Sequence, residues 1–123
     1  MTLDTNILIA YLEGDKDLVQ SLSTWRERGG FFYISTIVEA ELLSFPGLSD
    51  MEIDDLNNFL RENFVCVPFD RSLAQIAAKL RRTGKIKLPD AAIAATALFT
   101  KTPLMTRNSK DFRKIKDLQI VTI

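Results

Sequence analysis

The sequence contains no histidine and only one cysteine among its 123 residues. The absence of histidine excludes Ser-His-Asp and Cys-His nucleophile systems, a histidine proton shuttle and zinc sites with histidine ligands. The single cysteine, Cys66, excludes an intrachain disulfide and every multi-cysteine metal motif, and its valine neighbours indicate a small buried side chain. Chemistry in this chain must therefore come from carboxylates, hydroxyls, amides, lysine or arginine, with or without a hard cation.

Long apolar runs are also absent. The longest run, from Ala91 to Phe99, is interrupted by Thr96 and falls well short of the roughly 20 residues that cross a bilayer. Asp4 occurs before any apolar run builds up, so no signal peptide is recognisable. We therefore expect a cytoplasmic protein with no membrane partner, folded as one domain over residues 1–123.

The net charge is zero, but the charges are unevenly distributed along the chain. Residues 1–70 hold 13 acidic and 4 basic side chains, whereas residues 71–123 hold 3 and 12, so the two parts carry formal charges of −9 and +9. The basic residues form two clusters: Lys79, Arg81, Arg82, Lys85 and Lys87, and then Arg107, Lys110, Arg113, Lys114 and Lys116. Such clusters bind phosphate in some proteins and are solvated surface in others, and composition alone leaves both interpretations open.

Short apolar runs alternate with amphipathic stretches throughout the chain. The runs predict strands at Met1–Leu3, Phe31–Ile34, Val65–Phe69, Pro103–Thr106 and Gln119–Ile123. The amphipathic stretches predict helices at Asn6–Glu13, Lys16–Arg28, Ile37–Phe45, Asp50–Asn63, Ser72–Thr83 and Asp90–Thr100, and a short one at Ser109–Lys114. This alternation is typical of an α/β domain with a mainly parallel central sheet, here of about five strands, flanked by helices. Ligands of such folds bind beyond the carboxyl ends of the strands.

Two carboxylates stand out in the first half of the chain. Asp4 directly follows the first expected strand, at the mouth of the sheet, although it is also able to cap the next helix. Glu41 falls within the apolar stripe of its helix, where a carboxylate costs several kcal/mol unless a cation or hydrogen bonds compensate it. The alternative is that Glu41 lies at the edge of this stripe and reaches water. By contrast, Thr36 and Glu39 have the spacing of a capping box, which gives Glu39 a structural role.

Two more carboxylates occur in the second half. Asp90 opens an alanine-rich helix, and Asp111 falls in the first turn of a short helix that Asn108 or Ser109 could cap, so helix capping explains either of them alone. In combination, carboxylates that share one cleft repel each other unless a cation lies between them. Mg²⁺ and Mn²⁺ prefer such ligands, and a water acidified by the metal attacks a phosphodiester without histidine. The pattern predicts a metal-dependent nuclease.

Four motifs in order carry a family resemblance: residues 3–6 (Leu-Asp-Thr-Asn), residues 35–42, residues 90–98, and Thr106-Arg107-Asn108 followed by Asp111-Phe112. With these motifs the whole chain resembles PIN-domain proteins, and most closely the VapC-type toxins of toxin–antitoxin pairs. The resemblance implies a PIN fold and an endoribonuclease that depends on Mg²⁺ or Mn²⁺. It also implies a homodimer and an antitoxin partner that occupies the site.

The resemblance assigns roles to individual residues. It implies that Asp4 and Asp90 are metal ligands and that Glu41 is the third acid. The family's fourth polar position is often Asp but is Asn108 here, and Asp111, three residues on, is the other candidate for a catalytic acid at that position. The number of metal ions therefore stays open. We expect two further groups to orient or bind RNA: Asn6, Thr106, Arg107 and Asn108 near the site, and Arg81, Arg82, Lys85 and Lys87, which lead directly to Asp90.

Two other functions compete with this interpretation. A phosphoryl-transfer enzyme with an Asp nucleophile would use Asp4 after its strand, but the second Asp expected two residues on is Asn6. A PIN-fold binding module without activity is favoured only by Asn108. Finally, the apolar positions of the helices Lys16–Arg28 and Asp50–Asn63 exceed what a small sheet can cover. We expect part of them to form an exposed groove for a homodimer mate or an antitoxin helix.

Overall fold

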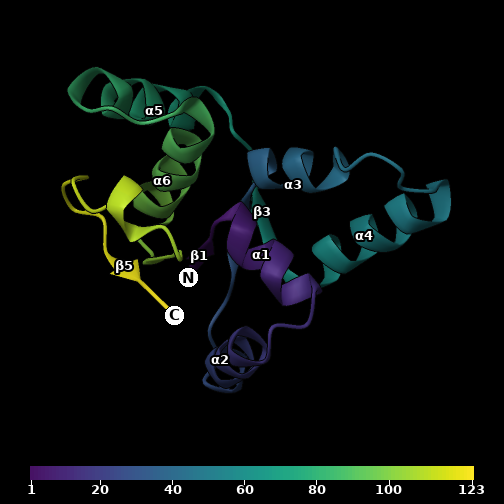
Figure 1. The fold of residues 1–123 in the computed structure, drawn as a ribbon. Helices are drawn as coiled ribbons and strands as arrows, with labels where there is room; N and C mark the ends of the chain where they lie inside the picture. Colours follow the sequence, from purple (N-terminus) through teal and green to yellow (C-terminus); the bar gives the residue numbers. More distant parts are fainter.

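Five short strands and six α-helices alternate along the chain in the computed structural model, which describes residues 1–123 (Figure 1). The strands are β1 (Thr2–Leu3), β2 (Tyr33–Ser35), β3 (Val65–Val67), β4 (Leu104–Met105) and β5 (Ile120–Val121). The helices are α1 (Thr5–Leu12), α2 (Lys16–Glu27), α3 (Thr36–Leu43), α4 (Asp50–Asn63), α5 (Arg71–Thr83) and α6 (Leu88–Thr100). Every predicted strand is present, and each is shorter than the apolar run that predicted it.

The strands form one sheet in the order β3-β2-β1-β4-β5, and all neighbouring pairs are parallel. In the register of the central strands, Thr2 lies opposite both Tyr33 and Leu104. The predicted α/β fold with a parallel five-stranded sheet is therefore confirmed. Because all strands run the same way, the residues that follow β1, β2 and β4 lie at one edge of the sheet, which we call the carboxyl edge.

Helix α6 lies against the centre of the sheet because its inner residues are small. Residues 91–97, five of them alanine, are all buried, and the helix packs on β1, β2, α3 and α5. Alanine lets a helix backbone approach its neighbours closely, so the first turn of α6 is brought near the carboxyl edge. In Figure 1, α5 and α6 lie on the opposite side of the molecule from α4, which projects outward.

Polar side chains cap the N-termini of several helices. Asp15 and Asp70 cap α2 and α5, and Ser49 forms a capping box with Glu52 at α4. The predicted capping box of Thr36 and Glu39 is wrong, because the N-cap of α3 is Ser35, whose hydroxyl accepts from the Ile37 N–H.

Thr36 and Glu39 instead tie α3 to the segment around β3. The Thr36 hydroxyl accepts from the Phe69 N–H, and the Cys66 thiol donates to Glu39 Oε2 at 2.6 Å. Cys66 is only partly buried, and burial together with Glu39 raises the pKa of its thiol to about 12. The side chain is therefore an inert thiol at neutral pH, although it is less buried than the sequence predicted.

The last predicted helix is shorter in the structure. Instead of a helix over Ser109–Lys114, the chain forms one 3₁₀ turn, η1 (Ser109–Asp111), and then continues in turns to β5. Phe112 is 1% exposed and anchors this segment in the core. No helix in the structure is long and apolar enough to cross a membrane.

Candidate active site

Asp4 occupies the junction between β1 and α1 and is almost completely buried, with 5% of its surface exposed. One carboxylate oxygen accepts from the Ile7 N–H at 2.9 Å and so caps α1. Burial raises the pKa of the Asp4 carboxyl, hydrogen bonds from Thr106 and Ile7 lower it, and the nearby Glu41 raises it again. Asp4 therefore has the capping role that the sequence allowed, and it is also a buried acid beside another acid.

Glu41 does not lie on the buried face of α3, contrary to its position in the apolar stripe. Val38 and Leu42 are buried, whereas Glu41 is exposed. The α3 helix turns Glu41 toward α1, where the Thr5 hydroxyl donates to Glu41 Oε1 at 2.7 Å. The carboxylate thus avoids desolvation at the rim of the site, and a neutral hydroxyl fixes its direction.

Asp90 lies in the first turn of α6 and is half-buried. Burial is the main cause that raises the pKa of its carboxyl, and the neighbouring charges of Asp111, Asp4 and Glu41 raise it further. Lys87 lowers the pKa of the same carboxyl. Asp90 thus lies within electrostatic reach of three other acids that come from distant parts of the sequence.

Asp111 is the fourth of these acids and lies in η1, exposed to solvent. The Asn108 side-chain amide donates to Asp111 Oδ2, and the Asn108 backbone N–H donates to Thr106 Oγ1 at 2.9 Å. Thr106 directly follows β4 and is fully buried. We use the name acidic cluster for Asp4, Glu41, Asp90 and Asp111.

The acidic cluster does not form a complete set of metal ligands. No group of three His, Cys, Asp or Glu side chains is arranged to hold a metal ion. The donor set nevertheless fits Mg²⁺ or Mn²⁺, because it consists of carboxylate oxygens only and because neighbouring acids help to raise the pKa of Asp4 and of Asp90, as expected where no cation separates carboxylates. Mg²⁺ is commonly held through one or two carboxylates and retains several waters, so it does not require three protein ligands in contact.

The basic residues expected to bind RNA are exposed. Arg81 and Arg82 lie in the last turn of α5, and Lys85 and Lys87 lie in the connection to α6. Arg81 is held in place because its Nε donates to the Ile86 carbonyl at 3.3 Å. Lys87 lies near the acidic cluster, as its effect on Asp90 shows.

Asn6 and Arg107, which were also expected near the site, differ in whether their side chains have a partner. Asn6 is exposed in the first turn of α1. The Arg107 guanidinium forms an ion pair with Asp15 at 2.9 Å, which ties the loop after β4 to the start of α2. Sequence reasoning missed the roles of Asp15 and Thr5. The only available signals were the position of Thr5 next to Asp4 and the suitability of Asp15 as a cap, and neither names a tertiary partner.

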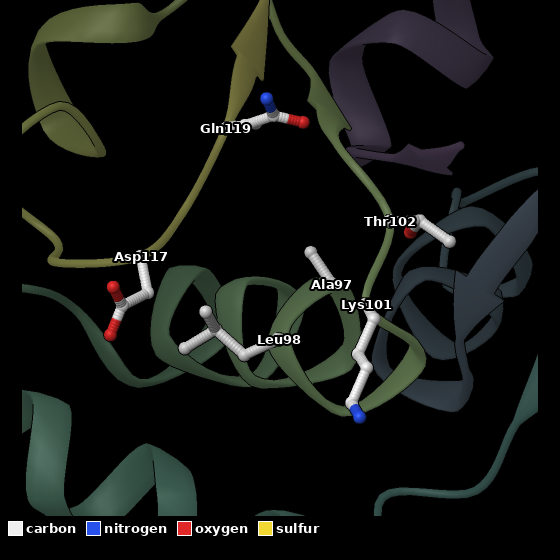
Figure 2. A pocket seen from close by; sticks show the side chains of 6 residues that line it. All are labelled: Ala97, Leu98, Lys101, Thr102, Asp117 and Gln119. Atoms are coloured by element: carbon white, nitrogen blue, oxygen red, sulfur yellow. The ribbon is translucent and has the colours of Figure 1, made fainter.

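A separate pocket lies at the other edge of the sheet. It has a volume of about 270 Å³ and is lined by Ala97 and Leu98 of α6, by Lys101 and Thr102, and by Asp117 and Gln119. Figure 2 shows Lys101 and Thr102 on the connection from α6 to β4, and Gln119 on the segment that leads into β5. Its single acid and single base do not form a metal site, so this pocket does not compete with the acidic cluster as the candidate active site.

Comparison with known proteins agrees with this geometry. The model of the PIN domain family matches residues 1–118. A protein named Ribonuclease VapC from Rickettsia bellii is 29% identical over 100% of this chain and 96% of its own length. A toxin–antitoxin complex from Klebsiella pneumoniae contains a chain with 32% identity and a TM-score of 0.79, covering 98% of this chain and 95% of that one.

A second solved structure extends the agreement in fold. VapBC-1 from nontypeable Haemophilus influenzae contains a chain with a TM-score of 0.83 at 24% identity, covering 98% of this chain and 96% of that one. The parallel sheet, the acids at its carboxyl edge and the match over nearly the whole length lead to the same assignment. The chain belongs to the PIN domain family.

Proposed function

We propose that this chain is an endoribonuclease that depends on Mg²⁺ or Mn²⁺ and acts as the toxin of a toxin–antitoxin pair. The observation that supports it most is the convergence of Asp4, Glu41, Asp90 and Asp111 at one edge of the sheet. Two of these acids are partly or fully withdrawn from solvent, with no basic side chain paired to either. The Ribonuclease VapC of Rickettsia bellii, which is similar over the full chain, supports the same activity.

The residues divide into three roles in this proposal. Asp4, Asp90 and Glu41 would hold the metal, and Asp111 would complete the acidic cluster. A bound Mg²⁺ or Mn²⁺ supplies an acidified water for attack on phosphorus and stabilises the negative charge that develops. Asp4 is held by its hydrogen bond at the start of α1, and the backbone of Asp90 belongs to the first turn of a buried helix.

The exposed bases would bind the RNA backbone beside this cluster. Arg81, Arg82, Lys85 and Lys87 lie along the approach to Asp90, and none of them forms an ion pair within the chain. Unpaired basic side chains are available to phosphates, and contacts of this kind give affinity that does not depend on sequence. Arg107 must exchange Asp15 for a phosphate if it also contacts RNA. The action on cellular RNA would place the protein in the cytoplasm.

Purified chain tests the activity directly. We expect cleavage of single-stranded RNA with Mn²⁺, no cleavage with EDTA, and none by the Asp90→Asn variant with Mn²⁺. Calorimetry with Mn²⁺ separates the competing function, because a binding module without activity should have negligible affinity for the metal. Cleavage that persists in EDTA would contradict the proposal.

An antitoxin partner is supported by partly covered apolar surface. On α4 only Leu60 is buried among the apolar positions, and Tyr11 of α1 stacks on Phe59 of α4 with ring centroids 6.2 Å apart. Large apolar side chains remain in solvent both on α4, where Met51 is 74% exposed, and outside it, where Leu12 is 44% and Phe45 49% exposed. A helix of an antitoxin would bury such a surface, and the similar chain from Klebsiella pneumoniae comes from a toxin–antitoxin complex.

A homodimer completes the proposed assembly. On α2, Leu18 and Leu22 are buried, but Val19 is 39% exposed and Trp25 is only partly buried, so this helix also retains apolar surface. Light scattering at micromolar concentration should give the mass of two chains. A monomer at that concentration would contradict the dimer without affecting the proposed activity.

A further inference from the structure

We propose that Asn108 is a positioning residue, which holds the Asp111 carboxylate toward the other acids and does not itself bind the metal or the RNA. This inference rests on the proposed metal-dependent function, because it concerns how one acid of the cluster is presented to a cation. It explains why an amide stands at a position where a carboxylate would be a ligand.

The contacts of Asn108 favour this role over helix capping. Asn108 is the N-cap of η1, but its side chain forms no capping hydrogen bond. The side-chain amide instead donates to Asp111 Oδ2. The backbone N–H of Asn108 donates to the hydroxyl of Thr106, which is fully buried at the end of β4. Asp111, which is exposed, is thereby connected to the rigid sheet through two hydrogen bonds.

The chemistry of the amide suits a carboxylate that must keep its charge. Lysine or arginine in the same place would hold Asp111 more strongly but would neutralise the charge that attracts a cation. An amide NH₂ group donates without carrying charge and has no lone pair for a metal. The opposite orientation would turn the amide oxygen toward the Asp111 oxygens, and these groups repel. Asn108 is therefore oriented as a donor to the acid, and the experiment below distinguishes this role from direct binding of the metal by the amide oxygen.

Glu41 is held by the same device. It too is exposed, and it accepts a hydrogen bond from the neutral hydroxyl of Thr5 at 2.7 Å. Each exposed acid of the cluster thus has a neutral side-chain donor, as the buried Asp4 has in Thr106. Without its donor, Asp111 would sample several rotamers, and cation binding would have to order it. Loss of such supporting contacts commonly weakens metal binding about 10- to 100-fold.

A double-mutant cycle with Asn108→Ala and Asp111→Asn tests the role through Mn²⁺ affinity, measured by calorimetry. The alanine variant keeps the backbone bond to Thr106 and loses only the amide. We expect Asn108→Ala to raise the Kd for Mn²⁺ about tenfold in the natural chain and less than about twofold in the Asp111→Asn background. At saturating Mn²⁺ the kcat for RNA cleavage should return to the range of the natural chain.

The matched control is Asn58→Ala on α4. Asn58 also contacts a side chain three residues away, accepting from Arg61 at 3.0 Å, but it lies far from the acidic cluster. This variant should bind Mn²⁺ like the natural chain. Melting temperatures check that all variants fold, and Asn108→Ser, whose hydroxyl is able to cap η1, replaces the alanine variant if that one is unstable.

Three outcomes would overturn the inference. Equal losses of affinity in both backgrounds would show that Asn108 binds the metal itself, and an unchanged Kd in the natural background would show that it has no role. A kcat that stays low at saturating Mn²⁺ would assign it to the substrate. In these cases the natural chain still binds Mn²⁺ and cleaves RNA, so the proposed function stands. A natural chain that does neither overturns both proposals.

Discussion

The two ends of strand β1 carry buried polar side chains that differ in whether their neighbours are neutral or charged. At the amino end, the Thr2 hydroxyl is fully buried and meets the hydroxyls of Thr102 at 2.6 Å and Thr100 at 3.5 Å. At the carboxyl end, Asp4 is equally withdrawn from water, but its neighbours include Glu41 and Asp90. Only one residue, Leu3, separates a neutral, satisfied group from a charged group among other charges.

This difference between the two ends of β1 indicates which of them lowers the free energy of unfolding. Buried polar groups are normally paired, as the three threonines are. A buried acid next to other acids is costly, and proteins retain such arrangements mainly at functional sites. The amino end therefore contributes to folding, whereas the carboxyl end would receive a cation under the proposed function. Four predictions test this contrast, and they begin with the largest effect.

Asp90→Asn should have the largest effect on RNA cleavage, because it removes one acid of the acidic cluster at the carboxyl end of β1. The amide has the same shape but carries no charge, so we expect RNA cleavage to fall by at least about 100-fold while the melting temperature is retained. Single-turnover cleavage with Mn²⁺ measures the loss. Asp50→Asn is the control, because Asp50 also lies in the first turn of a helix but is exposed on α4. Full activity of Asp90→Asn would refute the assignment of the acidic end.

Neutralising the exposed bases beside the acidic end should weaken RNA binding at every sequence. We expect the slope of log Kd against log salt to decrease by about one for each phosphate contact that is lost. The variant replaces Arg81, Arg82, Lys85 and Lys87 with Gln. Replacing Lys110, Arg113, Lys114 and Lys116 tests the second basic cluster in the same assay. An unchanged slope for the first variant would mean that its four side chains are merely solvated.

Asp4→Asn should raise the free energy of unfolding in EDTA at pH 7 by about 0.5–2 kcal/mol, because it removes a buried charge and asparagine also caps helices. The pKa of Asp4 is raised above its ordinary value of 3.8, so the charge destabilises the native chain above the raised pKa. The advantage of the variant should therefore disappear as the pH falls below 3.8. Urea unfolding at both pH values measures it.

The control for Asp4→Asn is Asp15→Asn, which should change the free energy of unfolding in the opposite direction. Asp15 also caps a helix, but its hydrogen bond from Leu18 and its contact with Arg107 lower the pKa of its carboxyl. Asp15→Asn should therefore reduce stability at pH 7, and this reduction should vanish at low pH, where the native Asp15 is protonated as well. Equal effects of the two substitutions at pH 7 would show that capping alone explains both residues.

Thr2→Val should give the smallest effect, at the amino end. It removes one buried hydroxyl, but Thr100 and Thr102 remain paired with each other at 3.0 Å. We expect a loss of about 0.5–1 kcal/mol in the free energy of unfolding and no change in RNA cleavage. Thr83→Val is the comparison, because this hydroxyl bonds to the Lys79 carbonyl on an exposed turn. A gain in stability from Thr2→Val would contradict the view that the polar group at the amino end of β1 stabilises the fold whereas Asp4 at the carboxyl end destabilises it.

Much of the fold could be predicted because it depends on local patterns. Short β-branched runs, amphipathic spacing and capping residues placed all five strands and six helices, with boundaries that differ by a few residues. The predicted helix over Ser109–Lys114 was wrong because its spacing did not reveal that the chain would leave helical geometry after Asp111. Of the two positions that the sequence left open for Glu41, the exposed edge of the apolar stripe is the one found, and helical spacing could not decide between them because it gives the angle around a helix but not the width of the surface that is covered.

The sequence by itself determined which residue types are available, namely acids, amides and bases without histidine, and it placed Asp4 and Thr106 directly after strands. Only the tertiary structure decided which of them meet. The hydrogen bond from Thr5 to Glu41, the ion pair of Asp15 with Arg107 and the mutual electrostatic effects of the four acids all join distant segments. The physical reason is that local sequence sets backbone conformation, whereas burial and electrostatic coupling arise only when parallel strands bring their carboxyl ends to the same edge.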